Sequence, residues 1–163
     1  MDLSIPAVQD WKTIETESML PALNENGDLP VGIHITDWSE LRQRFGTGSV
    51  TRVRALAKLR LLHQLSSGTG KLSRFIIFGS FLSATAEPRD VDVVLVMEED
   101  FKVENAPRES RTLFSHADAN ARYGASIFWF REGMLPAALA EEFFETWQTK
   151  RDGMKRGIVE VKA

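Results

Sequence analysis

The stretch that decides the fold reads FIIFGSFLS at residues 75–83 and, after a short gap, PRDVDVVLV at residues 88–96. Both runs are dense in β-branched and aromatic residues, which is typical of strands buried on two faces. The first run stops at Gly79-Ser80, and the second opens with Asp90 and Asp92. Because side chains alternate between the faces of a strand, the spacing predicts that both aspartates share one face.

Two carboxylates side by side on a β-surface repel each other, so the pattern predicts a cation between them. Magnesium is the obvious candidate, because it takes carboxylate oxygens and keeps phosphates as further ligands. Gly79-Ser80 offers a backbone without a Cβ, together with a hydroxyl, and this suits the close approach of a phosphate. The plainer interpretation is that the aspartates cap a turn after Pro88 and that Gly79-Ser80 merely ends a strand.

Length and composition indicate one globular domain. The chain has 163 residues, of which 43% are hydrophobic and 26% are charged, as is usual for folded proteins. Residues 1–30 form an N-terminal extension that is difficult to predict, although Trp11, Ile14, Met19 and Leu20 fit a short amphipathic helix. The absence of cysteine excludes disulfides and thiolate metal sites.

Net charge and hydropathy limit the kinds of binding partner and the cellular compartment that we expect. A net charge of −3 argues against non-specific binding to duplex DNA, although a local basic patch remains compatible with it. We find no secretory signal pattern, and no apolar run approaches the roughly 18–20 residues that a membrane span requires. We therefore expect a cytoplasmic protein without a membrane partner.

The rest of the chain predicts strands alternating with helices, that is, an α/β protein with a small mixed sheet flanked by helices. We expect strands at about 73–78, 91–97 and 125–130, and an edge strand at 157–161. Expected helices run from an N-cap at Thr36 to Gly46, over about 49–65, over about 107–116, and from Pro136 through Trp147.

The helix expected at 49–65 has an apolar stripe that predicts its buried face. That stripe consists of Val50, Val53, Leu56, Ala57 and Leu61. Its basic residues lie mostly off the stripe, so we expect them at the surface; they are Arg52, Arg54, Lys58 and Arg60.

Gly79-Ser80, a loop and then Asp90-Val91-Asp92 resemble the signature of the DNA polymerase β-like nucleotidyltransferase superfamily, especially its small stand-alone bacterial members. The fragments LPVGIH at residues 29–34 and RDGMKRGIV at residues 151–159 are also similar to a little-characterised bacterial family of this fold. The resembling parts together cover most of the chain from about Asp28 onward.

This resemblance implies that Asp90 and Asp92 hold one or two magnesium ions and that Gly79, Ser80 and Ser83 contact the phosphates of a nucleoside triphosphate. It implies transfer of a nucleoside monophosphate to an acceptor hydroxyl on a protein, an RNA end or a small molecule, with release of pyrophosphate. By analogy alone, it suggests a toxin–antitoxin or phage-defence setting.

Active members of the superfamily carry a third acidic residue on a neighbouring strand. The strand expected at 125–130 contains none, and we expect Ser126 at the corresponding position. Asp118, Glu132 and Glu99 lie outside that strand. Loss of a general base costs roughly 10²–10⁴ in rate, so three alternatives stay open: an active transferase, a catalytically lapsed nucleotide sensor or protein-interaction module, and an unrelated α/β domain.

A basic cluster near the C-terminus has two interpretations. Its members are Lys150, Arg151, Lys155 and Arg156. Such runs are usually solvated surface, whereas arginine forks also suit phosphate or RNA.

The histidines and tryptophans show no pattern that indicates a site. His34, His63 and His116 lack metal-ligand spacing, and we expect structural roles for them. Trp38, Trp129 and Trp147 favour a core role over a base-stacking platform, although a nucleobase would still need an aromatic ring at the rim of the cleft.

Overall fold

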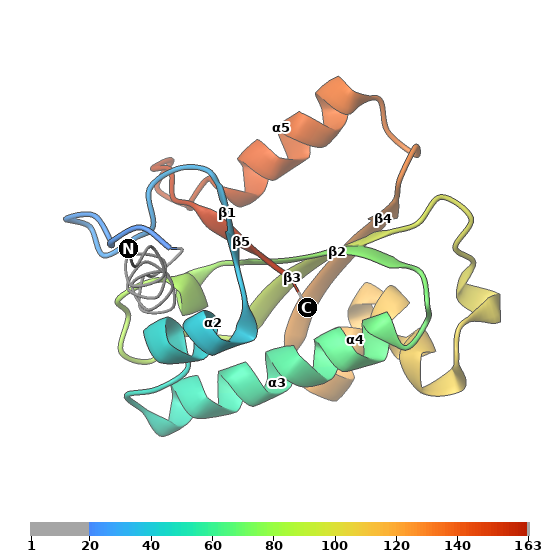
Figure 1. Ribbon diagram of the computed structural model, residues 1–163, viewed down its shortest axis with the longest axis horizontal. Helices are drawn as coiled ribbons and strands as arrows, with labels where there is room; N and C mark the ends of the chain where they lie inside the picture. Colours follow the sequence, from blue (N-terminus) through green and yellow to red (C-terminus); the bar gives the residue numbers. More distant parts are fainter. Residues whose placement is uncertain (1–19, 163) are drawn as a thin grey trace, which may run out of the picture.

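The computed structural model describes residues 20–162, in which helices cover both faces of a five-stranded mixed sheet (Figure 1). The strand order is β1-β5-β2-β3-β4, with β1 and β5 parallel, β3 and β4 parallel, and the other neighbours antiparallel. The strands are β1 (Ile33–Thr36), β2 (Leu72–Phe78), β3 (Val91–Met97), β4 (Ala125–Arg131) and β5 (Ile158–Val161). The α/β class with a mixed sheet is therefore confirmed.

Strands β2, β3 and β4 position the predicted site. Their bounds match the sequence prediction to within one residue at each end. Asp92 on β3 lies opposite Phe78 on β2 and opposite Ser126 on β4. Phe78, which directly precedes Gly79-Ser80, therefore lies in one row across the sheet with Asp92 and Ser126.

The prediction of an edge strand at 157–161 was wrong. Strand β5 lies between β1 and β2, and all four of its residues are buried. Glu160 made an interior position unexpected, but Arg74 and Lys162 form ion pairs with it and so allow a charged residue there. The edges of the sheet are β1 and β4. Strand β1 was missed because it has only four residues and weak alternation.

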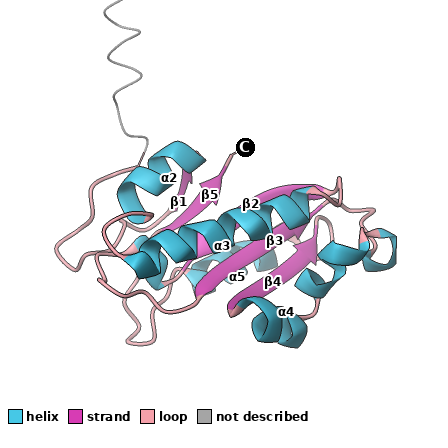
Figure 2. Cartoon of the chain, turned by 90° about the horizontal axis from the view of Figure 1, so that it is seen from below, coloured by secondary structure: helices cyan, strands magenta, loops and turns pink. Residues whose placement is uncertain are grey.

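Three helices cover one face of the sheet: α2 (Trp38–Phe45), α3 (Val50–Ser67) and α4 (His116–Tyr123) (Figures 1 and 2). The N-cap of α2 is Asp37, whose side chain accepts from the amide of Glu40, and not Thr36. The helix predicted at 107–116 is instead a 3₁₀ segment (Arg108–Phe114) followed by α4. No helix within residues 20–162 is both long enough and apolar enough to cross a membrane.

The buried face of α3 also differs from the prediction. Of the expected stripe, only Leu56 is buried, whereas Val50, Val53 and Leu61 are 65%, 53% and 42% exposed. The core side of α3 is formed by Arg52, Ala55, Leu56, Leu59, Leu62 and Ser66. Both sides of α3 carry apolar residues at helical spacing, so spacing alone does not identify the buried side. Arg52 can lie on the buried side because its guanidinium donates to buried backbone carbonyls.

Within residues 20–162, α5 (Ala137–Trp147) is the one helix that covers the second face of the sheet, and it lies across the sheet from α2 and α3 (Figure 1). Its buried cluster is small and consists of Ile76, Val94, Val96 and Ile158. Asp92 shares this face, since strand side chains alternate and Val94 belongs to the cluster. One helix does not cover the whole face, so the end at Asp92 stays open.

The segment that precedes β1 is part of the packed structure where it is described. Leu20 and Leu29 are buried in the larger core, and Asp28 is buried beside the basic cluster. The helix expected around Trp11, Ile14 and Met19 lies outside the described residues.

Candidate functional site

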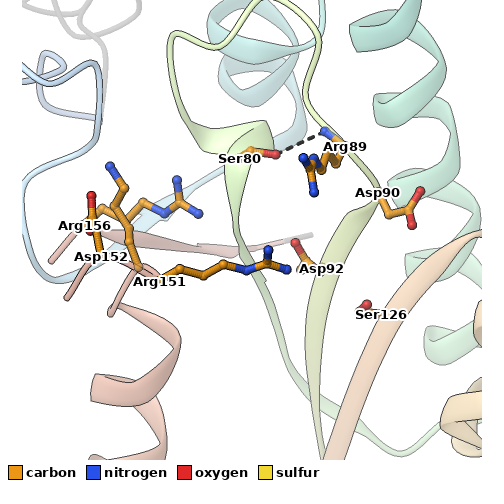
Figure 3. A pocket seen from close by; sticks show the side chains of 9 residues that line it. Ser80, Arg89, Asp90, Asp92, Ser126, Arg151, Asp152 and Arg156 are labelled. Atoms are coloured by element: carbon orange, nitrogen blue, oxygen red, sulfur yellow. Dashed lines mark hydrogen bonds between the residues drawn. The ribbon is translucent and has the colours of Figure 1, made fainter. Parts of the chain in front are cut away.

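A pocket of about 630 Å³ opens at the end of the sheet where β2 stops and β3 begins (Figure 3). The side chains around it are Ser80, Arg89, Asp90, Asp92, Ser126, Lys150, Arg151, Asp152 and Arg156. The structure therefore brings together three predicted site residues and three members of the basic cluster. Lys155 does not line the pocket; its ammonium group donates to the hydroxyl of Thr149.

Gly79 lies directly against the carboxylate of Asp92. Its backbone has φ +90°, and a Cβ built on it would overlap Oδ2 of Asp92. Both the dihedral and the lack of space require glycine here. The sequence suggested close approach of a phosphate at Gly79-Ser80, which stays a prediction; the structure shows that the Gly79 backbone lies against the Asp92 carboxylate.

Asp92 is half-buried and has no ion-pair partner within 4.0 Å among residues 20–162. Burial raises its pKa to about 6, although a hydrogen bond from Ser126 works in the opposite direction. The charge of Asp90 raises this pKa further, and the more distant charge of Arg156 lowers it. At neutral pH the protein thus holds an ionised carboxylate that its own side chains do not neutralise.

The spacing predicted that Asp90 and Asp92 share one face of the strand, and this prediction was wrong. Asp90 lies in a bend just before β3 and is exposed, and its side chain points away from that of Asp92 in Figure 3. Its carboxylate lies near Gly124, where Lys58 also approaches. The alternation rule failed because it holds only within the hydrogen-bonded ladder, which begins at Val91. Joint coordination of one ion by both carboxylates requires the exposed Asp90 side chain to turn.

The loop after Gly79 is held from both sides. The Ser80 hydroxyl faces the pocket and accepts from the amide of Arg89 at 3.2 Å. Ser83 is buried and does not line the pocket; its hydroxyl donates to the Ser80 carbonyl at 2.7 Å and bonds Thr85. The predicted phosphate contact of Ser83 stays a prediction; in the structure its side chain shapes the turn.

Arg52 supports the same loop from the core. Its guanidinium donates to the carbonyls of Phe45, Phe81, Ser83 and Thr85. Sequence reasoning missed this residue because it assigned Arg52 to the exposed side of α3. The loop that carries Ser80 is consequently fixed by a buried cation and does not depend on a ligand for its shape.

The basic cluster splits into two kinds of residue. Lys150 and Arg156 form ion pairs with the buried Asp28, at 2.9 Å and 3.7 Å. Arg151, like Arg89, forms no ion pair within residues 20–162. Figure 3 shows Arg151 and Arg156 across the pocket from Asp90 and Ser126. No local signal identified Asp28, because it lies 122 residues from Lys150 in the chain.

The side chains of the pocket suit a magnesium ion that is held by one or two carboxylates, and not a metal ion whose ligands all come from the protein. Within residues 20–162, no group of three or more His, Cys, Asp or Glu side chains is placed to hold a metal ion. Ser126 lies beside Asp92, where the superfamily pattern expects a third carboxylate. Magnesium commonly takes one or two carboxylates and completes its shell with water and substrate phosphates, and the uncompensated Asp92 meets that requirement.

The histidines make contacts of a structural kind. His34 bonds the carbonyl of Pro30, His116 bonds the carbonyl of Ile127, and the His63 ring packs edge-on against Trp38 and Phe75. None of the three lines the pocket.

Together these features define a mixed-sheet α/β protein with a charged pocket at a glycine-serine bend. The pocket combines a half-buried carboxylate with two arginines, Arg89 and Arg151, and none of these three side chains forms an ion pair in the described part of the chain. A family model matches residues 21–162, and the chain belongs to that family, DUF6932, a family of unknown function. Comparison with curated proteins and with solved structures gave no significant match.

Proposed function

We propose that this protein binds a nucleoside triphosphate together with magnesium at the pocket. Gly79 and Ser80 contact the phosphates, and Asp92, assisted by Asp90, holds the ion. The observation that carries the proposal is the contact between the Gly79 backbone and the half-buried Asp92 carboxylate, which forms no ion pair within residues 20–162. A structural carboxylate in that position would be expected to have a cationic side chain beside it.

The charges around the pocket support a polyanion as the other ligand. Arg89 and Arg151 are free of ion pairs among the described residues, and arginine forks match phosphate oxygens. Lys150 and Arg156 add positive charge, although Asp28 offsets part of it. A volume of about 630 Å³ is in the range of small-ligand pockets.

In the transfer reaction, an acceptor oxygen bonds the α-phosphorus as its bond to the bridging oxygen breaks and pyrophosphate leaves. The proton of the acceptor hydroxyl passes to water. Bound magnesium supplies charge stabilisation of the entering and leaving oxygens. The protein's own side chains would orient the phosphates through Ser80, Arg89 and Arg151, and Asp92 and Asp90 would hold the ion. The acceptor is a hydroxyl on a protein, an RNA end or a small molecule, and we expect the reaction to take place in the cytoplasm.

A second candidate is a nucleotide sensor or protein-interaction module that binds without turnover. Ser126 favours it, because this residue offers a hydroxyl beside Asp92 in place of a carboxylate base. Binding requires only the cation and phosphate contacts, whereas efficient transfer also requires a proton acceptor.

Thermal unfolding with each nucleoside triphosphate, with and without magnesium at pH 7.5, tests the binding proposal. At a hundredfold excess over Kd, binding to the folded state adds about 2.7 kcal/mol, or roughly 5–10 °C for a chain of this size. Asp92→Asn should abolish the magnesium-dependent shift. Glu99→Gln is the matched control, because it removes an exposed acid beyond the other end of β3 and should leave the shift intact.

A magnesium-dependent shift in the wild type that Asp92→Asn retains would contradict the assigned site. No shift with any triphosphate would contradict the proposed function itself. A shift without turnover of labelled nucleotide, in the presence of cell extract as a source of acceptors, would select the sensor over the transferase.

A further inference from the structure

Four aromatic rings lie beside the pocket on the less covered face of the sheet. We call them the aromatic surface; they are Phe78, His116, Phe128 and Trp147. The Phe128 ring lies 4.9 Å from His116, 6.2 Å from Phe78 and 6.3 Å from Trp147, measured between centroids. Phe78 and Trp147 are 5.9 Å apart, so the rings form one continuous group.

Phe128 is exposed although it points to a face that α5 otherwise covers. Its neighbours Phe78 and Trp147 are half-buried, whereas 41% of Phe128 is open to solvent. The helix ends at Trp147 and leaves the ring uncovered. An exposed ring whose edges are fixed by three other rings is a rigid, flat binding surface.

The aromatic surface adjoins the charged pocket on two sides. Phe128 follows Ser126 on the same face of β4, so the two side chains are separated by about 7 Å along the strand. Phe128 pairs with Val94 of β3, which is the next residue after Asp92 on the same face of that strand. Trp147 is followed closely by the turn that carries Lys150 and Arg151. The aromatic surface, whose rings are tilted by 34–40° to one another, therefore continues into a cationic, hydroxyl-bearing pocket.

We propose that the aromatic surface is the nucleobase subsite of the nucleotide whose phosphates occupy the pocket, with the base stacked on Phe128. This inference rests on the proposed function. A nucleotide has the same division as this part of the protein, with a flat π-system at one end and polyanionic charge at the other. Stacking on an aromatic ring is tolerant of base identity, so all four triphosphates bind within a few-fold of one another.

Calorimetric titration with triphosphates and with inorganic tripolyphosphate, each with magnesium, tests this subsite. Wild type should bind the nucleotides about five- to a hundredfold more tightly than tripolyphosphate, the range expected for one stacked base. Phe128→Ala should remove that difference while leaving tripolyphosphate binding unchanged, and Phe128→Trp should restore it. Leu61→Ala is the matched control, a truncation of an equally exposed apolar residue on α3, and should change neither affinity.

The outcomes separate the two proposals. If tripolyphosphate and nucleotides bind equally well, or if Phe128→Ala weakens both alike, the subsite is overturned while phosphate binding in the pocket stands. If neither ligand binds wild type, the proposed function fails and the subsite fails with it. Nucleotide binding that is unchanged in Phe128→Ala would likewise overturn the subsite, because the ring would then contribute nothing to nucleotide affinity.

Discussion

Glu160 and Asp92 lie on the same face of one sheet and are treated in opposite ways. The Glu160 carboxylate is buried, but Arg74 contacts it through two nitrogens, at 2.7 Å and 3.0 Å, and Lys162 contacts it at 2.6 Å. Burial alone would raise the pKa of Glu160, yet the hydrogen bonds and charges of Arg74 and Lys162 outweigh it and leave the pKa lowered. Asp92 has no such partner, and its pKa rises to about 6.

Asp28 extends the comparison, because it is buried and paired with two cations like Glu160. Glu160 and Asp28 are each buried and each paired with two cationic side chains. Asp92 has a glycine backbone and a serine hydroxyl beside it instead. The difference supports the proposal that a bound cation is the counterion of Asp92, and substitutions on both sides of the comparison test it.

The largest effect is expected from Gly79→Ala. The new Cβ would overlap the Asp92 carboxylate, and the alanine backbone would have to keep φ +90°, which L-residues avoid. Together these effects should lower the free energy of unfolding by about 3–4 kcal/mol. Urea unfolding measures the loss. Gly48→Ala is the control, since Gly48 has φ +99° but open space around it, and strain alone should cost about 1–2 kcal/mol. Equal losses in the two variants would show that Gly79 and Asp92 are not in contact.

Arg74→Met should destabilise the protein by about 2–3 kcal/mol in the same measurement. It leaves Glu160 buried with Lys162 as its one remaining partner among the described residues, and a broken buried ion pair leaves an uncompensated charge. Because the Arg74 guanidinium also packs over Phe144, methionine is chosen to keep the apolar contact. The double variant Arg74→Met/Glu160→Gln should recover most of the loss; failure to recover it would mean that packing, and not charge, dominates at Glu160.

Asp92→Asn should have the smallest effect and the opposite sign. Removing a half-buried charge without a partner should stabilise the ligand-free protein by about 1 kcal/mol at pH 7.5, after allowance for residual solvent, or roughly 2–4 °C. Destabilisation would show that Asp92 is a structural carboxylate like Glu160.

The pH dependence of the free energy of unfolding gives a further test of the raised pKa of Asp92. A carboxyl group whose pKa is 3.8 in the unfolded chain and about 6 in the fold binds more protons when folded. Its contribution to stability is therefore lost as pH rises from about 4 to 6. Wild type should lose stability relative to Asp92→Asn across this window, and magnesium with a triphosphate should reduce the difference above pH 6. For Glu160, whose pKa is lowered, stability is lost as pH falls through that lowered pKa.

Several elements were predictable because their signals are local. The runs that form β2, β3 and β4 end where composition changes, and Gly46 and Pro136 mark helix boundaries in α2 and α5. The row of Phe78, Asp92 and Ser126 follows once those strands pair. The resemblance to the nucleotidyltransferase superfamily stays a prediction, as do the roles that it implies for Asp90, Asp92, Gly79, Ser80 and Ser83.

Other features could not be read locally. The exposed side of α3 was taken for its core side, because helical periodicity allows either and a buried Arg52 was not expected. Asp90 was assigned the face of Asp92, but the ladder begins one residue later. Strand β5 was placed at the edge, although a charged residue can lie inside a sheet when distant partners neutralise it.

The order of residues was enough to place a glycine-serine bend before a strand that opens with acids, because alternation and turn chemistry act over a few neighbouring residues. Which of the buried acids are neutralised depends on long-range packing: Arg74 lies 86 residues from Glu160, and Lys150 lies 122 residues from Asp28. Charges interact through space and not along the chain, so only the folded arrangement distinguishes Asp92, which forms no ion pair within residues 20–162, from Glu160 and Asp28, which are paired.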